Sequence, residues 1–258
     1  SVGLAGPAAL FGALTRDYLE THSLEPTSGR FYAHLGDAEM DEGSMWEAVI
    51  EPVLNGIDRC TWVVDVNRQS LDRVVPGIRV RQFMDMLTAN GWTVFTAKYG
   101  DRLTELMHRP GGEALRRRID DMSNEEYQGL LVSDHGELKG RLLDGAGKGR
   151  SDLQRCVGDV DDDELYERII NLGGHDVDYL SRLLQQATDT PGSTAVFAYT
   201  VKGWGLHSAA DPRNHATTLT LEQFDQLAET TGRDPDNPWE RFSESSAEHK
   251  YIDDAIRR

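Results

Sequence analysis

The chain has 258 residues, a formal net charge of −17 and a hydrophobic content of 38%, which favour one large folded domain or two small ones. This acidity excludes a typical nucleic-acid-binding protein, because phosphate backbones are bound by clustered Lys and Arg. No apolar run approaches the length of a membrane span. The two cysteines, Cys60 and Cys156, suggest no disulfide framework. We therefore expect a cytoplasmic protein with neither a nucleic-acid nor a membrane partner.

Helical and strand-like patterns alternate along much of the chain. A first helix is expected after Pro7, because Leu10, Phe11, Leu14 and Tyr18 recur on one helical face. The expected strands cover residues 30–35, 61–66, 92–97 and 194–200, and further helices cover residues 44–54, 80–89, 178–187 and 221–230. Solid apolar strands that alternate with helices predict an α/β fold with a doubly wound, mostly parallel sheet.

Residues 110–170 interrupt this alternation. They are polar and contain no long strand, which predicts a helical insertion with one mobile loop in the glycine-rich stretch 144–150. The basic run 116–118 is interpreted as a solvated helix face, with a basic patch for a partner as the alternative. After the helix at 221–230, residues 232–258 are expected to form a C-terminal extension of polar coil.

Two of the expected strands end in residues with oxygen-bearing side chains. Asp37 follows the first strand, and Asn67 and Gln69 follow the second. The carboxyl ends of parallel strands share one edge of the sheet, so Asp37, Asn67 and the Gln69 carbonyl can converge there. Magnesium prefers oxygen ligands and commonly completes its shell with substrate phosphates. The alternative is that Asp37 caps a helix and Asn67 sits in a turn.

The residues around Asp37 suit a diphosphate. Gly36 and Ala38 are small, so a ligand can approach the backbone closely, and Glu39 can present its amide to a phosphate. Amide groups at the start of a helix attract anions for the same reason.

This layout resembles the thiamine-diphosphate signature, in which Gly-Asp-Gly is followed one helix later by Asn. The segments 36–42, 67–72 and 90–94 are similar to consecutive blocks of one family, the decarboxylating component of the pyruvate dehydrogenase complex of the homodimeric bacterial type. Transketolases are its wider relatives. Segments 124–128, 134–136 and 173–176 extend the resemblance through the insertion. One departure is Ala38, which stands where the family has glycine.

The resemblance implies further site residues. Lys202 belongs to a segment similar to the family's Lys-Gly-Tyr-Gly and would contact the diphosphate, whereas an ordinary solvated lysine is the alternative. Val2 would hold the cofactor's aminopyrimidine ring through its amide, unless the terminus is flexible. His215 would correspond to the mobile-loop histidine that assists acyl transfer, and His207 and His175 are the next candidates. A structural role is the alternative for His175.

The implied function is that of residues 1–258 as the diphosphate-binding domain of an enzyme that uses thiamine diphosphate and Mg²⁺. The sheet pattern occurs once in these residues, so the resemblance implies that a pyrimidine-domain subunit completes the active site, in a heterotetramer. The substrate would be a pyruvate-like 2-oxoacid and the acceptor a lipoyl group. A split transketolase-like carboligase, which makes an α-hydroxyketone from an aldehyde acceptor, remains an alternative. So do a catalytically degenerate assembly or regulatory subunit and a generic phosphate-binding α/β domain.

Overall fold

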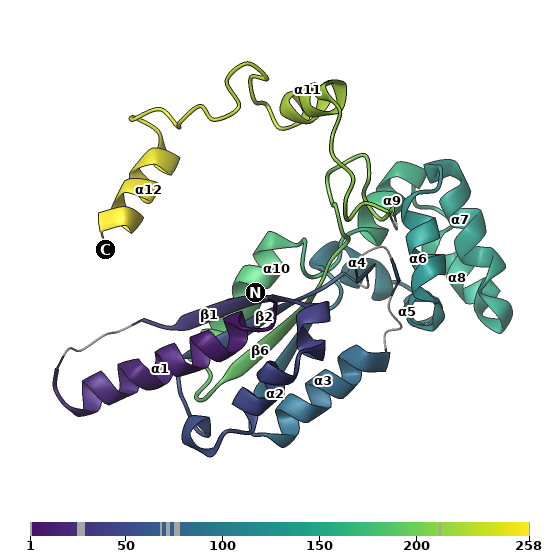
Figure 1. Ribbon diagram of the computed structural model, residues 1–258. Coiled ribbons are helices and arrows are strands. Elements are labelled where there is room, and N and C mark those ends of the chain that lie inside the picture. The colour runs from purple at the N-terminus through teal and green to yellow at the C-terminus, as the bar shows by residue number, and fades with distance from the viewer. Residues whose placement is uncertain are drawn as a thin grey trace.

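The centre of the protein is a parallel sheet of four strands in the order β1-β2-β6-β5, shown in Figure 1. The computed structural model describes residues 2–24, 29–67, 69–70, 73–74, 78–211 and 213–257. The sheet strands are β1 (Phe31–Gly36), β2 (Cys60–Val66), β5 (Thr93–Ala97) and β6 (Thr194–Tyr199). Their positions and parallel directions confirm the α/β class predicted from the apolar runs.

Helices cover both faces of the sheet (Figure 1). On one face, α1 (Ala5–Thr21), α2 (Gly43–Val49) and α3 (Ile78–Ala89) enclose an apolar core that includes the fully buried Trp62 of β2. On the other face, α10 (Val177–Asp189) packs against β5 and β6. The expected doubly wound arrangement is therefore confirmed.

The second helix is shorter than predicted. It ends at Val49 rather than near residue 54, and a 3₁₀ turn, η2 (Pro52–Leu54), follows it. Pro52 cannot donate a main-chain hydrogen bond to a continuing helix, but it suits the first position of a new turn.

The insertion between β5 and β6 consists of short helices around a core of their own. These are α4 (Asp101–Met107), α5 (Gly112–Asp121), α6 (Asn124–Leu131), α7 (His135–Asp144), α8 (Arg150–Val157) and α9 (Asp162–Ile169). The glycine-rich stretch predicted as a loop connects α7, which ends at Asp144, to α8, which begins at Arg150, and it contains a 3₁₀ turn, η3 (Gly147–Gly149). Its mobility stays a prediction.

The basic run 116–118 is not a uniformly solvated face. Arg118 is only 7% exposed, donates a hydrogen bond from Nε to the Leu142 carbonyl at 3.1 Å, and forms an ion pair with Glu126. A Cβ atom at Gly145 would lie 1.9 Å from the Arg118 guanidinium, so the glycine leaves room for this buried cation. The interpretation of Arg118 as a surface residue was wrong, because α5 turns it toward α7.

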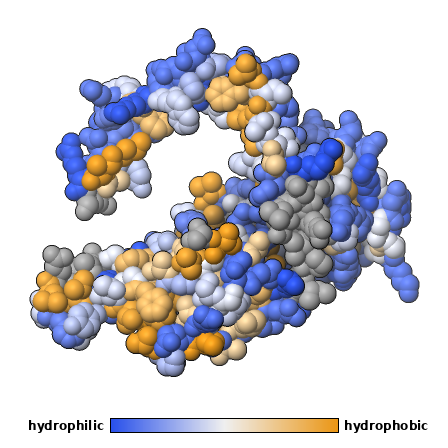
Figure 2. Space-filling model, viewed as in Figure 1, coloured by the Kyte–Doolittle hydropathy of each residue, from blue (hydrophilic) through white to orange (hydrophobic). Residues whose placement is uncertain are grey.

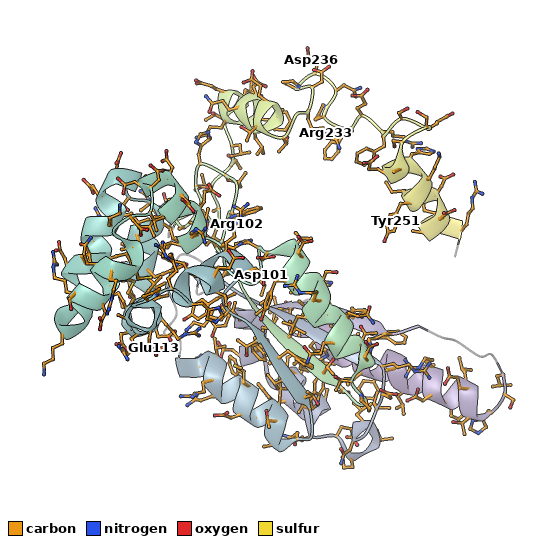
Figure 3. All side chains as sticks on the ribbon, turned by 180° about the vertical axis from the view of Figure 1, so that it is seen from behind. Asp101, Arg102, Glu113, Arg233, Asp236 and Tyr251 are labelled. Atoms are coloured by element: carbon orange, nitrogen blue, oxygen red, sulfur yellow. The ribbon has the colours of Figure 1, made fainter. Side chains whose placement is uncertain are left out.

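The C-terminal region extends away from the sheet as an arm (Figures 1 and 2). It contains α11 (Leu221–Thr230) and α12 (Ala247–Arg257), so the prediction of polar coil was wrong for residues 247–257. The Ser246 hydroxyl accepts a hydrogen bond from the His249 amide at 3.1 Å and starts this last helix. None of the residues of α12 is buried, and Figure 3 shows Tyr251 on it, remote from the sheet.

No helix in the described part of the chain combines the length and apolarity needed to cross a membrane.

The space around two helical glycines, Gly6 in α1 and Gly140 in α7, predicts opposite effects on stability when each is replaced by alanine. A Cβ atom at Gly6 would lie 2.6 Å from the Met45 side chain and 2.7 Å from the Trp62 ring, whereas one at Gly140 in α7 meets nothing within 4 Å. We expect Gly6→Ala to lower the free energy of unfolding by about 1–3 kcal/mol through overpacking. Gly140→Ala should raise it by up to about 1 kcal/mol, because alanine is the better helix former. Urea denaturation measures both, and equal effects in the two variants would contradict the packing.

Candidate functional site

The residues expected to hold a metal lie at the ends of two neighbouring strands. β1 and β2 pair in parallel with Gly36 opposite Asp65, so Asp37 and Asn67 leave the sheet at the same edge. The loop after β6 begins at this edge as well, because the Thr200 amide donates to the Val66 carbonyl at 3.1 Å. The sheet therefore brings the Asp37 and Asn67 segments together as predicted.

Asn67 is oriented by a carboxylate from its own strand. Its Nδ2 donates to Asp65 Oδ2 at 3.0 Å. The other oxygen of Asp65 accepts a hydrogen bond from the Thr200 hydroxyl. Because Asp65 accepts only through oxygen, it binds the nitrogen end of the Asn67 amide. The amide oxygen is thus the atom of Asn67 suited to ligate a cation.

Glu39 joins the motif to the N-terminal segment. Its Oε1 accepts from the Gly3 amide at 3.1 Å, and its Oε2 accepts from the Gly36 amide at 2.9 Å. The Gly3 carbonyl in turn accepts from the Ser44 hydroxyl at 2.8 Å. Gly3 has a φ of +75°, and a Cβ atom there would lie 2.5 Å from Cβ of Glu42. The segment that carries Val2 is therefore clamped beside the motif, and the Val2 side chain is 64% exposed.

The backbone next to Asp37 is open at Gly36. A Cβ atom at Gly36 would meet only Glu39 Oε2, at 3.9 Å. Ala38 lies in the 3₁₀ turn η1 (Asp37–Asp41) and is absent from the residues with positive φ. Alanine at this position therefore imposes no backbone strain, and the departure from glycine is compatible with the turn.

The donor set fits magnesium with a diphosphate better than a protein-only metal site. In the described residues, no three His, Cys, Asp or Glu side chains gather as a metal cluster. Asp37, Asn67 and the main-chain carbonyl of Gln69, in β3 (Gln69–Ser70), are one carboxylate and two neutral oxygen donors. Such a partial set is what Mg²⁺ uses when substrate phosphates complete its shell.

Lys202 and His215 lie together in the loop after β6. Lys202 Nζ is 3.3 Å from His215 Nδ1. Asn214 Nδ2 closes the loop by donating to the Lys202 carbonyl at 2.9 Å and to the Ser208 carbonyl at 3.0 Å. A small cavity lined by Asn67 and Lys202 connects this loop to the strand ends. Lys202 thus shares a cavity with Asn67 and lies within hydrogen-bonding distance of His215.

His175 supports the same loop from behind. Its Nε2 accepts a hydrogen bond from the Val201 amide at 2.7 Å, and its ring stacks on Trp204 with centroids 4.6 Å apart. Burial lowers the pKa of His175, while the negative charge of Asp65 acts in the opposite direction. The hydrogen bond requires a neutral ring with its proton on Nδ1. These contacts give His175 a structural role in holding the Lys202 turn.

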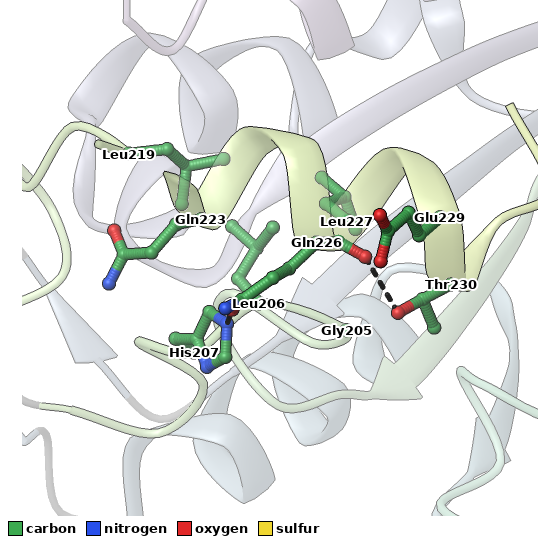
Figure 4. Close-up of a pocket in the computed structure, with 9 residues that line it drawn as sticks. All are labelled: Gly205, Leu206, His207, Leu219, Gln223, Gln226, Leu227, Glu229 and Thr230. Carbon is green, nitrogen blue, oxygen red and sulfur yellow. Dashed lines mark hydrogen bonds between the residues drawn. The ribbon is translucent and has the colours of Figure 1, made fainter. Parts of the chain in front are cut away.

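His207 faces the C-terminal arm instead of the strand ends. Its Nε2 lies 2.8 Å from Gln226 Oε1 of α11. Both residues line a cavity of about 440 Å³ between the loop and α11. Figure 4 draws the residues that line it. The structure therefore separates His207 from the other candidates.

Two polar contacts of the site were not predicted from the sequence. The side chain of Glu39 reaches Gly3 across 36 positions of the chain, whereas only its main-chain amide was expected to act. Asp65 lies in the expected strand at residues 61–66, and its spacing of two residues from Asn67 is the signal that could have identified it.

Comparisons with known proteins show which sequences and folds the chain resembles. No protein-family model matches the sequence. The chain is 28% identical to the pyruvate dehydrogenase E1 component of Escherichia coli K12 over 98% of its length, and 28% identical to that of Corynebacterium glutamicum over 88%. It spans only 29% and 24% of the lengths of those two proteins.

The fold has solved counterparts. A transketolase mutant from Pichia stipitis in complex with xylulose 5-phosphate aligns with 99% of this chain and 28% of its own, at a TM-score of 0.53 and 13% identity. The transketolase from Leishmania mexicana aligns with 94% of this chain and 25% of its own, at a TM-score of 0.50 and 15% identity. These structures confirm the transketolase-like fold, and the sequence matches confirm the resemblance to the pyruvate dehydrogenase component. The sequence is thus similar to pyruvate dehydrogenase E1 components, and the fold is similar to that of transketolases.

The role of His175 predicts a specific pH dependence of stability. Its lowered pKa means that the unfolded chain binds the proton more tightly, so its contribution is complete above about pH 6.5 and is lost as the pH falls below that value. Glutamine can place an acceptor near the Nε2 position but does not titrate. We expect the free energy of unfolding of His175→Gln to approach or exceed that of the wild type as the pH falls from about 8 to about 5. Parallel curves from urea denaturation at several pH values would contradict this role.

Proposed function

We propose that this chain is the thiamine-diphosphate- and magnesium-binding subunit of an enzyme that decarboxylates a pyruvate-like 2-oxoacid and transfers the acyl unit. The observation that carries the proposal is the register of β1 and β2, which places Asp37 and Asn67 at one edge with Asp65 orienting the amide. The relatives named pyruvate dehydrogenase E1 component support the reaction class.

Each site residue has a distinct task in this proposal. Asp37, Asn67 and the Gln69 carbonyl would hold Mg²⁺, which would supply positive charge to the diphosphate. The main chain at Gly36, Ala38 and Glu39 would accommodate the phosphates.

Lys202 supplies a positive charge at the diphosphate. When bound, thiamine diphosphate supplies the carbon nucleophile and electron sink for decarboxylation, and this chain supplies binding and orientation. The Glu39 clamp keeps the Val2 amide beside the cofactor's ring.

A pyrimidine-binding subunit completes the active site in this proposal, with two copies of each chain in a heterotetramer. The exposed apolar surface of the C-terminal arm supports such a partner. Trp239 is 89% exposed, and Tyr251 and Ile256 of α12 are 77% and 78% exposed. Large apolar side chains exposed in this way are typical of interaction surfaces.

His215 is the candidate for acyl transfer, because it lies beside Lys202 at the strand ends. His207 lies beside α11, away from the strand ends, and His175 acts only through the loop that it supports.

A lipoyl acceptor is preferred to an aldehyde because the match to the pyruvate dehydrogenase E1 component of Escherichia coli K12 covers 98% of the chain, insertion included. A cytoplasmic location, expected from the cysteine content, remains a prediction.

The metal assignment predicts the loss of magnesium-dependent cofactor binding in Asp37→Ala and in Asn67→Ala. Mutation of residues that merely orient metal ligands costs roughly 10- to 100-fold in affinity, so removing a ligand should cost at least as much. Calorimetric titration of thiamine diphosphate, with and without Mg²⁺, measures the effect on the enzyme assembled with its pyrimidine-domain partner.

Asp41→Ala is the matched control. Asp41 ends the same 3₁₀ turn, but its carboxylate pairs with Arg79 at 2.7 Å on the surface, and exposed pairs contribute little. The affinity of Asp41→Ala for thiamine diphosphate should stay within about twofold of the wild-type affinity. If Asp37→Ala and Asn67→Ala bind as tightly as this control, the magnesium site is wrongly assigned.

A further inference from the structure

Gln128 of α6 is a buried polar side chain. The residue is 8% exposed, and its carbonyl oxygen, Oε1, makes no hydrogen bond to any of the residues that the structure describes. A buried acceptor left unpaired costs free energy relative to hydration. Such groups are uncommon in folded proteins and call for an explanation, such as a missing ligand.

The position of Gln128 supplies this explanation. It lines a cavity of about 10 Å³ together with Asn67 from the end of β2, and with Thr200 and Lys202 from the end of β6. Of these residues, the proposed function places Asn67 at the metal and Lys202 at the diphosphate. The helical insertion therefore contributes a polar group to the edge of the sheet where the cofactor is proposed to bind.

The walls around Gln128 are fixed by other contacts. Its neighbour Tyr127 is buried and donates from its hydroxyl to the Ile169 carbonyl at 2.9 Å, which anchors α6 to α9. Across the cavity, Ala210 has a φ of +60° and donates from its amide to the Lys202 carbonyl at 3.0 Å. A non-glycine residue in this backbone region is strained, and such strain often marks a binding site. These contacts hold the residues around Gln128 in place.

We propose that Gln128 is a further cofactor-binding residue, which reaches the phosphate end of the magnesium–thiamine-diphosphate group from the insertion. This inference rests on the proposed function. A carboxamide suits this place because its nitrogen can donate to a phosphate oxygen while its oxygen accepts from a metal-bound water. The second of these bonds would satisfy the carbonyl oxygen, for which the described residues provide no partner.

Gln128→Met tests the inference, because it keeps the side-chain length and removes both polar atoms. We expect its melting temperature without ligand to equal or exceed that of the wild type, since an unsatisfied buried group is lost. The affinity for magnesium–thiamine diphosphate should fall about 10- to 100-fold, the usual loss for a hydrogen bond to a charged group. Magnesium with inorganic diphosphate should lose affinity by the same factor, because the contact is to the phosphate end. Calorimetry measures binding, and thermal denaturation measures the melting temperature.

Gln186→Met, at an exposed position of α10, is the control and should change neither quantity. Unchanged affinity in Gln128→Met, or a fall in its melting temperature together with its affinity, would overturn the inference and leave Gln128 a packing residue. Gln128→Met should still need Mg²⁺ for binding, which distinguishes it from Asp37→Ala. If the wild type itself binds neither ligand, the proposed function fails first, and this inference fails with it.

Discussion

The parallel register of β1 and β2 is the constraint on which the site depends. Burial sets this register, because side chains alternate between the two faces of a strand and Leu35 belongs to the face that packs on the core. A slip of one residue would expose that face and would also move Asp37 relative to Asn67. The same apolar contacts that stabilise the fold therefore fix the distance between the proposed metal ligands. Gly36 opposite Asp65 is the visible result.

Hydrogen bonds then orient the side chains and backbone segments that the strand register brings to this edge of the sheet. Asp65 turns the Asn67 amide, and Glu39 ties Gly3 and Gly36 to one carboxylate. The first turn of α1 follows directly from Gly3 and packs on the core through Gly6, so the N-terminal segment cannot move independently of the motif. The loop with Lys202 is held in a comparable way by a histidine behind it and an asparagine within it. The site is thus largely organised by the chain before a cofactor binds, which reduces the ordering cost of binding.

The sequence predicted those features that depend on local pattern. Apolar runs identified the four sheet strands, and the spacing of Asp37 and Asn67 after two of them identified the edge where they meet. Features that depend on distant partners were missed: the Glu39 side chain acts on Gly3, and Arg118 is buried because α7 happens to lie beside it. The last helix was missed because its charged residues resemble coil, although its apolar residues repeat at helical spacing. The unpaired carbonyl of Gln128 could be recognised only once its surroundings were known.

The central claim is that Asp37 and Asn67 hold one divalent cation against a diphosphate. Crystals grown with Mn²⁺ in place of Mg²⁺, and with thiamine diphosphate, test it directly by anomalous diffraction at the manganese edge. The account predicts a single strong peak at coordination distance, about 2.0–2.2 Å, from the Asp37 carboxylate and the Asn67 amide oxygen, with diphosphate density on its other side. A peak elsewhere on the molecule, or cofactor density with no metal between these two residues, would contradict it.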